Sequence, residues 1–300
     1  MKHFQLEHLA TFAAAVEQGT FEAAARQLHV TASAVSQRIK AMEQAAGQVL
    51  LQRSVPVLPT AAGEAVMRLA RQVGQLQADA ARALGDAGGA ATLPLVVNAD
   101  SLATWFLPVL ARIPREAGAC FEIHREDEQH SSALLRTGRV MAAVTAAPEA
   151  VQGCTVEALG ALRYRAVASP DFLAAWPRPD AGPEETGWPG DAPVVDFDRK
   201  DEIQNRFYRQ LTGRDLHAPR HYVPASAEFA EAVRLGLGWA LLPEQHCLDG
   251  LASGALRELA PEMPLDVPLY WQRWKISSPL LELLTEAVRT TATEALRPGP

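Results

Sequence analysis

The stretch from residue 31 to residue 46, TASAVSQRIKAMEQAA, constrains the fold of this chain more than any other. At 100° per residue, Val35, Ile39 and Met42 lie on one stripe of a helix. The opposite side carries small polar side chains and one cation, at Ser33, Ser36, Gln37, Lys40 and Gln44. Thr31 stands where an N-cap is expected. A helix of this kind suits entry into a DNA major groove, although an ordinary solvated face is the alternative.

The segments on either side favour the DNA-binding interpretation. Apolar residues recur at helical spacing from Leu6 to Val16 and stop at Gly19, and a second short helix is expected to start after Thr20. Two helices, a brief turn and the helix at 31–46 make a helix-turn-helix. The apolar pair at 50–51, followed by prolines at 56 and 59, predicts a β-wing.

Residues 4–64 resemble the winged helix-turn-helix of LysR-type transcriptional regulators. The string FEAAARQLHVTASAVSQRIKAMEQAAGQVLLQR, followed by LPTAAGE, carries the resemblance. The chain departs from the family at Leu51, where Phe is frequent, and at Pro59-Thr60, where Leu-Thr is frequent. Together with the exposed helix face, the resemblance implies DNA contacts from Thr31, Ser33, Ser36, Gln37, Arg38, Lys40 and Arg53. We expect Thr31 and Arg53 to lie on or near phosphates.

The composition agrees with such a protein. A chain of 300 residues with 48% apolar content can form two modest domains with real cores. The net charge is −7, but residues 1–60 carry +1, so the remainder carries −8. The three cysteines are far apart and suit a reducing cytosol. Because the sequence shows no leader and no membrane-spanning apolar run, we expect a soluble cytoplasmic protein without a membrane partner.

A helical segment rich in Ala, Arg and Gln follows from residue 60 to about residue 85. Its apolar residues alternate in steps of four and three, which is a narrow heptad seam: Ala62, Val66, Leu69, Val73, Leu76, Ala80 and Ala83. Such a seam pairs with a second helix, or alternatively packs on its own domain. The family resemblance implies a dimerising linker helix, with Val66, Leu69, Val73 and Leu76 at the contact. Residues 86–90 then read as a hinge.

Beyond the hinge, predicted strands alternate with predicted helices, which favours a parallel sheet with crossover helices. In LysR-type regulators such halves form two subdomains that resemble periplasmic binding proteins. The expected organisation is therefore a winged helix-turn-helix at 1–60, a linker helix at 61–86 and an effector domain at 92–300. Within the effector domain, subdomain I would comprise 92–162 and 267–300, and subdomain II would comprise 163–266. The fold class is an all-α winged helix-turn-helix with a dimerising linker helix, joined to a two-subdomain α/β effector domain.

Four strings in this domain resemble the ArgP/LysG branch of the family, which senses basic amino acids and controls their export. They are NADSLATWFLPVL, REDEQHSSALLRTGRVMAAVT, GLGWALLPE and PLYWQRWK. A helix start beside a hydroxyl can hold a carboxylate, and acidic residues after a neighbouring strand can receive a cation. The predicted effector contacts are Asp100, Ser101, Trp105, Glu126, Asp127, Glu128, Thr145 and Ser226.

Several of these residues have a simpler interpretation. The acidic run at 126–128 would ordinarily be solvated surface, and Asp100 could cap the helix that follows it. Trp271 and Trp274 are more typical of packing than of a binding site. His124 and His130 lack the further ligands that a zinc site needs, so no metal is expected.

The sequence thus predicts a transcriptional regulator, most simply an activator, that responds to lysine, arginine or histidine and controls an amino acid exporter gene. The expected partners are double-stranded promoter DNA, the basic amino acid and further copies of the chain in a homodimer or homotetramer, with RNA polymerase as a further candidate. The alternative is a solute-binding protein or an enzyme on the same two-subdomain scaffold. No catalytic motif or phosphate-binding glycine loop supports that alternative, and no catalytic residue or cofactor is expected.

Overall fold

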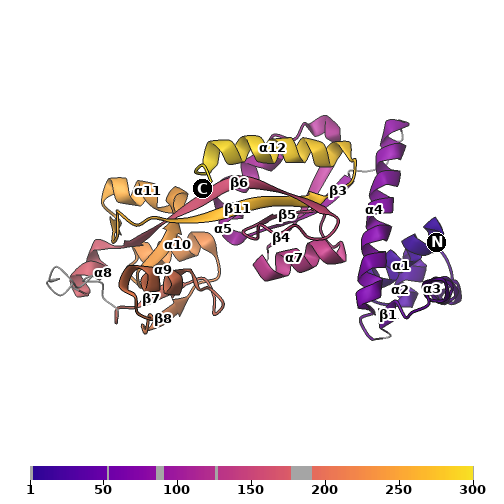
Figure 1. Ribbon diagram of the computed structural model, residues 1–300, viewed down its shortest axis with the longest axis horizontal. Helices are drawn as coiled ribbons and strands as arrows, with labels where there is room; N and C mark the ends of the chain where they lie inside the picture. The colour runs from indigo at the N-terminus through magenta and orange to yellow at the C-terminus, as the bar shows by residue number, and fades with distance from the viewer. Residues whose placement is uncertain (1–2, 53, 86–90, 126–127, 177–190, 300) are drawn as a thin grey trace. The chain divides into compact units, whose positions relative to one another are not determined.

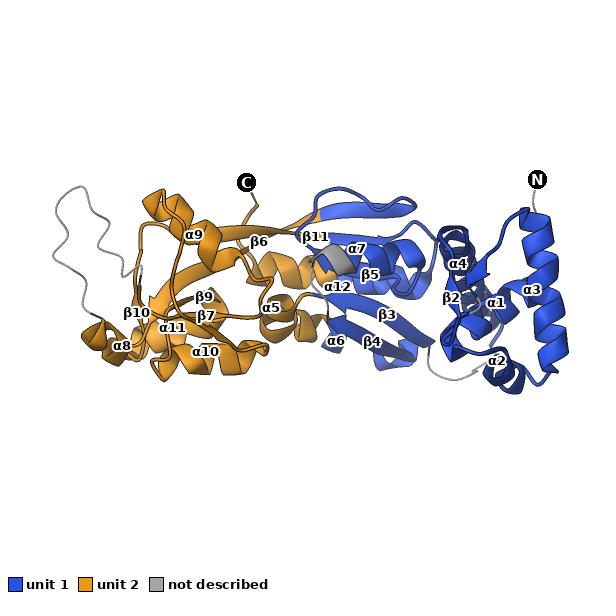
Figure 2. Ribbon diagram, turned by 90° about the horizontal axis from the view of Figure 1, so that it is seen from below, with its two compact units in different colours: residues 1–97, 110–157, 271–287 blue, residues 98–109, 158–270, 288–300 orange. Residues whose placement is uncertain are grey.

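The computed structural model describes residues 3–52, 54–85, 91–125, 128–176 and 191–299 (Figure 1). Contacts divide the chain into two compact units (Figure 2). Unit 1 comprises residues 1–97, 110–157 and 271–287, and unit 2 comprises residues 98–109, 158–270 and 288–300. The chain therefore passes from one unit to the other several times, so each unit is built from segments that are distant in sequence.

Unit 1 begins with the three helices predicted from the sequence. They are α1 (Leu6–Gln18), α2 (Phe21–Gln27) and α3 (Ala32–Ala46). Gly19 ends α1 in the left-handed conformation, and the hydroxyls of Thr20 and Thr31 cap the next two helices by accepting from backbone N–H groups three residues on. The inward faces of all three helices share one apolar core with the helix that follows the wing.

The wing consists of β1 (Leu51–Gln52) and β2 (Leu58–Pro59), an antiparallel pair that leads into α4 (Ala61–Ala83). Thr60 caps α4. A Cβ on Gly63 would lie 2.0 Å from the carbonyl oxygen of Leu50, so only glycine lets α4 approach the wing this closely. Val66, Met67 and Ala70 bury the first half of α4 in the core of the DNA-binding helices.

The remainder of unit 1 is built on parallel strands. β3 (Ala91–Val97) pairs in parallel with β4 (Ala119–Arg125) and with β5 (Ala142–Thr145). Short helical segments and α7 connect these strands: α6 (Leu107–Ala111), η2 (Arg115–Ala117) and α7 (Glu128–Thr137). α7 packs on the sheet through Leu135, which lies in a buried cluster with Val96 and Ala143.

Unit 2 starts with the helical turns α5 (Ala99–Ser101) and η1 (Leu102–Phe106). Its strands are β6 (Cys154–Ala168), β7 (Val194–Asp196), β8 (Arg220–Tyr222), β9 (Ala240–Pro243), β10 (Arg257–Glu258) and β11 (Leu265–Trp274), of which β6 and β11 begin or end in unit 1. Its helices are α8 (Pro170–Ala175), α9 (Ile203–Thr212), α10 (Ser226–Arg234), α11 (Glu244–Ser253) and the end of α12 (Pro279–Ala295).

Part of the strand prediction was wrong. β6 pairs antiparallel with β9 and β10, so the parallel pairing that the alternation of strands and helices favoured does not extend to these strands. β6 is also 15 residues long, whereas the sequence pattern predicts a strand only at YRAVAS, residues 164–169. The helices α8 and α11 were not predicted. The expected boundaries of the domains and subdomains stay a prediction, because units defined by contacts need not coincide with subdomains.

Candidate functional site

The exposed face of α3 is the candidate DNA-binding surface. Val35, Ile39 and Met42 are buried in the core, which turns the opposite side of the helix to solvent. The side chains on that side are exposed, and they are Ser33, Ser36, Gln37, Lys40 and Gln44. Their hydroxyl, amide and ammonium groups can donate to or accept from base edges and phosphates. The residues predicted to contact bases are thus presented together on one exposed helix face.

Two predicted DNA contacts, Thr31 and Arg38, stand apart from this face. The Thr31 hydroxyl accepts from the N–H of Ala34, so it is already used as a cap. Arg38 donates from Nη2 to Glu7 Oε2 at 3.0 Å and from Nη1 to Thr11 Oγ1 at 3.0 Å. This guanidinium is bound to α1, which favours a role in positioning α3 over the direct DNA contact expected from the sequence. Arg53 lies outside the described residues.

The heptad seam of α4 is divided between two roles. Val66 and Val73 pack against the core that α4 shares with α1, which supports the alternative interpretation of packing on their own domain. Their part in a dimer contact stays a prediction. Leu69 and Leu76 are 39% and 44% exposed, although both are leucines. They follow one line along the helix, and this exposed line is the part of the predicted seam that remains available to a partner chain.

The candidate effector site in unit 2 centres on Asp100. Its Oδ2 accepts a hydrogen bond of 2.8 Å from the Tyr164 hydroxyl, and its Oδ1 accepts one of 3.1 Å from the Ser226 hydroxyl. Burial raises the pKa of Asp100, although these two hydrogen bonds and the nearby His246 act to lower it. A nearby carboxylate, Asp201, raises this pKa further. The structure therefore brings two predicted residues, Asp100 and Ser226, into contact.

Tyr164 is the member of this group that the sequence analysis missed. It lies in β6, is buried, and its own pKa is raised well above the ordinary value by burial and by the adjacent Asp100 carboxylate. The neutral hydroxyl is therefore a permanent donor to Asp100. No motif could have indicated it, because a tyrosine in a strand of mostly apolar residues is typical of a core.

Ser101 and Trp105 are buried beside this group. Within the described part of the chain, neither the Ser101 hydroxyl nor the Trp105 indole N–H has a hydrogen-bond partner. Asn98 caps the helical turn by accepting from the Ser101 N–H at 2.8 Å. The suggestion that Asp100 is the N-cap was wrong for this reason, and one backbone N–H expected to hold a carboxylate is already bound.

The remaining predicted effector residues belong to unit 1. Thr145 ends β5, is buried, and accepts from the N–H of Ala147 at 2.9 Å. Glu128 is the first residue of α7, while Glu126 and Asp127 lie outside the described residues. The tryptophans expected to pack, Trp271 and Trp274, are buried. The described residues contain no group of three metal-ligating side chains and no helix long and apolar enough to cross a membrane.

Two family descriptions match consecutive parts of the chain. Residues 6–64 match the bacterial regulatory helix-turn-helix proteins of the lysR family, and residues 86–293 match the LysR substrate binding domain. The chain belongs to the LysR family. Membership confirms the predicted fold class and the predicted class of function, a DNA-binding transcriptional regulator.

Similar proteins within the LysR family cover nearly the whole chain. The lysine export transcriptional regulatory protein LysG of Corynebacterium efficiens is 40% identical over 291 residues, which is 97% of this chain and 98% of that protein. The crystal structure of ArgP from Mycobacterium tuberculosis has a TM-score of 0.90 at 40% identity and covers 98% of both chains. Full-length LysG from Corynebacterium glutamicum with bound effector Arg has a TM-score of 0.83 at 38% identity, covering 98% of this chain and all of that one.

Proposed function

We propose that this LysR-family chain is a cytoplasmic transcriptional activator that senses lysine, arginine or histidine and controls the gene of an amino acid exporter. It acts as a homodimer or homotetramer on promoter DNA, and RNA polymerase is its proposed partner in activation. It carries out no catalysis. The names of its relatives, a lysine export regulator and a LysG with bound effector Arg, support this proposal.

The observation that supports a cationic effector is the state of Asp100. A carboxylate has about four acceptor positions, and the Tyr164 and Ser226 hydroxyls occupy two of them. Burial raises the pKa of Asp100, which means that the ionised form lacks the stabilisation that water would give it. An ammonium or guanidinium group supplies that stabilisation through charge-assisted hydrogen bonds. An effector without a cationic group forms no ion pair with Asp100. Because every amino acid carries an α-ammonium group, Asp100 supports a cationic ligand in general, and the names of the relatives support a basic amino acid in particular.

Calorimetry on the full-length protein tests the effector assignment. Lysine, arginine and histidine should be compared with glutamine and glutamate, and binding should be confined to the basic amino acids. Asp100→Asn removes the charge at nearly constant shape and should weaken binding of the basic amino acid by about 1.5–3 kcal/mol. The matched control is Asp249→Asn, the same change at an exposed position of α11 in the same unit. Heat from glutamate and none from a basic amino acid would refute the assignment.

DNA binding needs a separate measurement, because the two activities can fail independently. The protein should retard a fragment of DNA from upstream of its own gene and of a neighbouring exporter gene in a gel, in preference to random DNA. Asp100→Asn should leave the retardation without effector unchanged. Failure to prefer any upstream fragment would contradict the regulator assignment for those genes.

A further inference from the structure

The guanidinium of Arg71 joins three segments of unit 1. Arg71 lies in α4 and donates from Nε and Nη2 to Glu17 Oε1 of α1, at 3.2 and 2.9 Å. Its Nη1 donates to the carbonyl oxygen of Gly138, directly after α7, at 2.7 Å. A planar guanidinium can hold two partners in fixed directions at once, which a lysine ammonium does less well. One side chain thus links the last turn of α1 to the end of α7.

The contact around Arg71 is closely fitted. Gly138 has a φ of +77°, and a Cβ at this position would lie 2.7 Å from the Cα of Arg68. Both the backbone conformation and the approach to α4 therefore require glycine. Arg68, one turn before Arg71, donates from Nη1 to the carbonyl oxygen of Gln152 at 2.9 Å. Two arginines on one face of α4 thus bind two separate backbone carbonyls.

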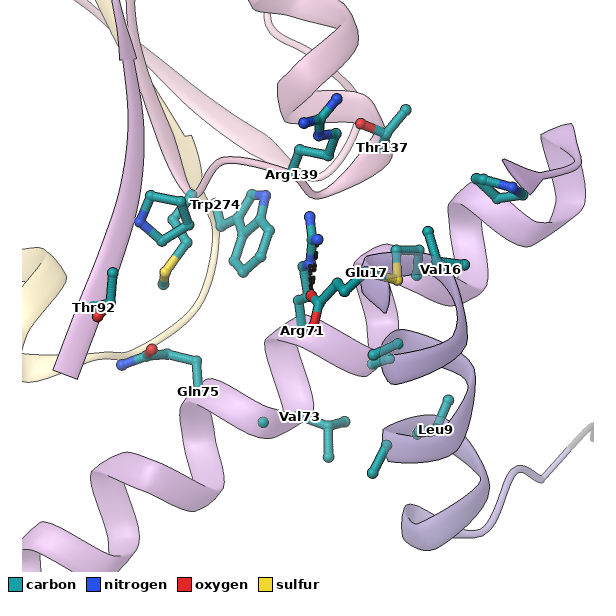
Figure 3. Close-up of a pocket in the computed structure, with 18 of the residues that line it drawn as sticks. Leu9, Val16, Glu17, Arg71, Val73, Gln75, Thr92, Thr137, Arg139 and Trp274 are labelled. Atoms are coloured by element: carbon teal, nitrogen blue, oxygen red, sulfur yellow. Dashed lines mark hydrogen bonds and ion pairs between the residues drawn. The ribbon is translucent and has the colours of Figure 1, made fainter. Parts of the chain in front are cut away.

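A cavity of about 830 Å³ lies beside this contact. Leu9 and Val73 line it from α1 and α4, and Thr92, Thr137 and Trp274 line it from the other side. The Glu17–Arg71 pair also lines the cavity and lies between these two sides (Figure 3). Where the cavity lies between α1 and α4 on one side and Thr92, Thr137 and Trp274 on the other, the side chains of the two sides do not pack against one another. Beside the cavity, α4 is connected to this part of unit 1 by the bond from Arg71 to Gly138, the bond from Arg68 to Gln152 and the close approach at Gly138.

We propose that Arg71, assisted by Arg68, is the positioning residue through which a change at α7 reaches the DNA-binding helices. α7 begins at Glu128, a predicted effector residue, and its ten residues span about 15 Å to the end that Arg71 holds. α1 and α4 share the core of α3, so a displacement at Gly138 is passed to the helix that faces DNA. This proposal rests on the proposed function, because it supplies the path by which the effector acts.

The first test measures the ratio of DNA affinities with and without saturating arginine in the full-length protein. A coupled regulator has a ratio on the order of 5–150-fold. Arg71→Ala should bring the ratio close to one while leaving the affinity for arginine and the DNA affinity without arginine close to wild type. Arg71→Lys should give an intermediate ratio. The control is Arg82→Ala, since Arg82 also lies in α4 but pairs with Asp79 of the same helix. An unchanged ratio in Arg71→Ala overturns the proposal.

The second test needs no effector. In the effector-free protein, Arg71→Ala should speed up backbone hydrogen exchange at two places, Gly138–Val140 and the last turn of α1. Arg82→Ala should change the exchange rate at neither place. Faster exchange at only one of the two places overturns the proposal, because it shows that Arg71 does not connect them. If the wild-type protein binds no basic amino acid, the proposed function fails, and exchange at these two places still decides whether Arg71 links them.

Discussion

Arg38 distinguishes a residue that positions the recognition helix from one that contacts DNA. Its guanidinium bonds to Glu7 and to the Thr11 hydroxyl of α1. The Glu7 side chain is 76% exposed, and such an ion pair contributes at most about 1 kcal/mol. Thr11 keeps a partner without Arg38, because its hydroxyl also donates to the Glu7 carbonyl oxygen at 2.7 Å. Arg38→Ala should therefore lower the free energy of unfolding by about 1 kcal/mol.

The assay combines denaturation with DNA titrations at several salt concentrations. If Arg38 positions α3, Arg38→Ala and Glu7→Gln should lower the free energy of unfolding by similar amounts, and neither should change the salt dependence of DNA binding. Lys40→Ala is the contrasting variant, because Lys40 is exposed on the candidate DNA-binding face. It should change stability by less than about 0.5 kcal/mol and make the negative slope of log K against log salt shallower by about 0.9, the contribution of one phosphate contact.

One result would refute this reasoning. If Arg38→Ala made the negative salt slope shallower by about 0.9 while Glu7→Gln left it unchanged, Arg38 would neutralise a phosphate despite its bonds to α1. The ion pair with Glu7 would then be an arrangement of the DNA-free protein that opens on binding.

Three further predictions concern the reading of DNA, the dimer contact and the buried carboxylate of Asp100. Gln37→Ala should weaken binding to preferred DNA sites by about 1–3 kcal/mol and leave random DNA nearly unaffected, as titrations of both would show. Leu69→Asp combined with Leu76→Asp should place charge in a dimer contact and yield monomers in sedimentation; an intact dimer would locate the contact elsewhere. Burial raises the pKa of Asp100 in the folded protein above its value of about 4 in the unfolded chain. The free energy of unfolding should therefore fall as the pH rises from about 4 through the pKa of the folded state. Asp100→Asn should therefore have a higher free energy of unfolding than wild type at pH 7 and a smaller advantage at pH 4. Denaturation curves at the two pH values measure this difference.

The DNA-binding half was largely predictable because its signals are local. The caps at Thr20 and Thr31, the left-handed Gly19 and the 3.6-residue spacing of Val35 and Ile39 each lie within a few residues of the structure that they determine. The structure places α3 at Ala32–Ala46, as the pattern indicates. The ion pair of Arg38 could not be predicted, because its partner Glu7 is 31 positions away.

The heptad seam shows the limit of periodicity. A regular spacing of Val66, Leu69, Val73 and Leu76 indicates an apolar stripe, but it does not say how many partners share that stripe. Here the stripe is divided: Val66 is buried in the core that α4 shares with α1, Val73 is partly buried against that core, and the leucines are exposed. The division follows from the position of α1, which depends on the tertiary fold.

The effector site was predictable only in part. Asp100 and Ser226 were identified from their places at the ends of strands, but their mutual contact spans 126 positions. Tyr164 was not identified, because a tyrosine among the apolar residues of a strand is typical of a core. Asn98 takes the capping position and leaves the Asp100 carboxylate for other partners. A cap and a ligand-binding carboxylate have the same local sequence signature, so only the tertiary structure distinguishes them.

The cost of burying Asp100 bears on how a regulator of this kind would respond to its effector. Without a cation, the ionised carboxylate relies on two neutral hydroxyl donors and lies near a second carboxylate, Asp201. Unit 2 is therefore less stable at neutral pH than it would be with an uncharged side chain at this position. A ligand biases a conformational equilibrium only through the difference in its affinity for the two states. If one conformation of the effector domain brings the cation to Asp100, only that conformation recovers the lost stabilisation. An analogue of the same shape without the cation would bind both conformations alike, so it would leave DNA binding unchanged.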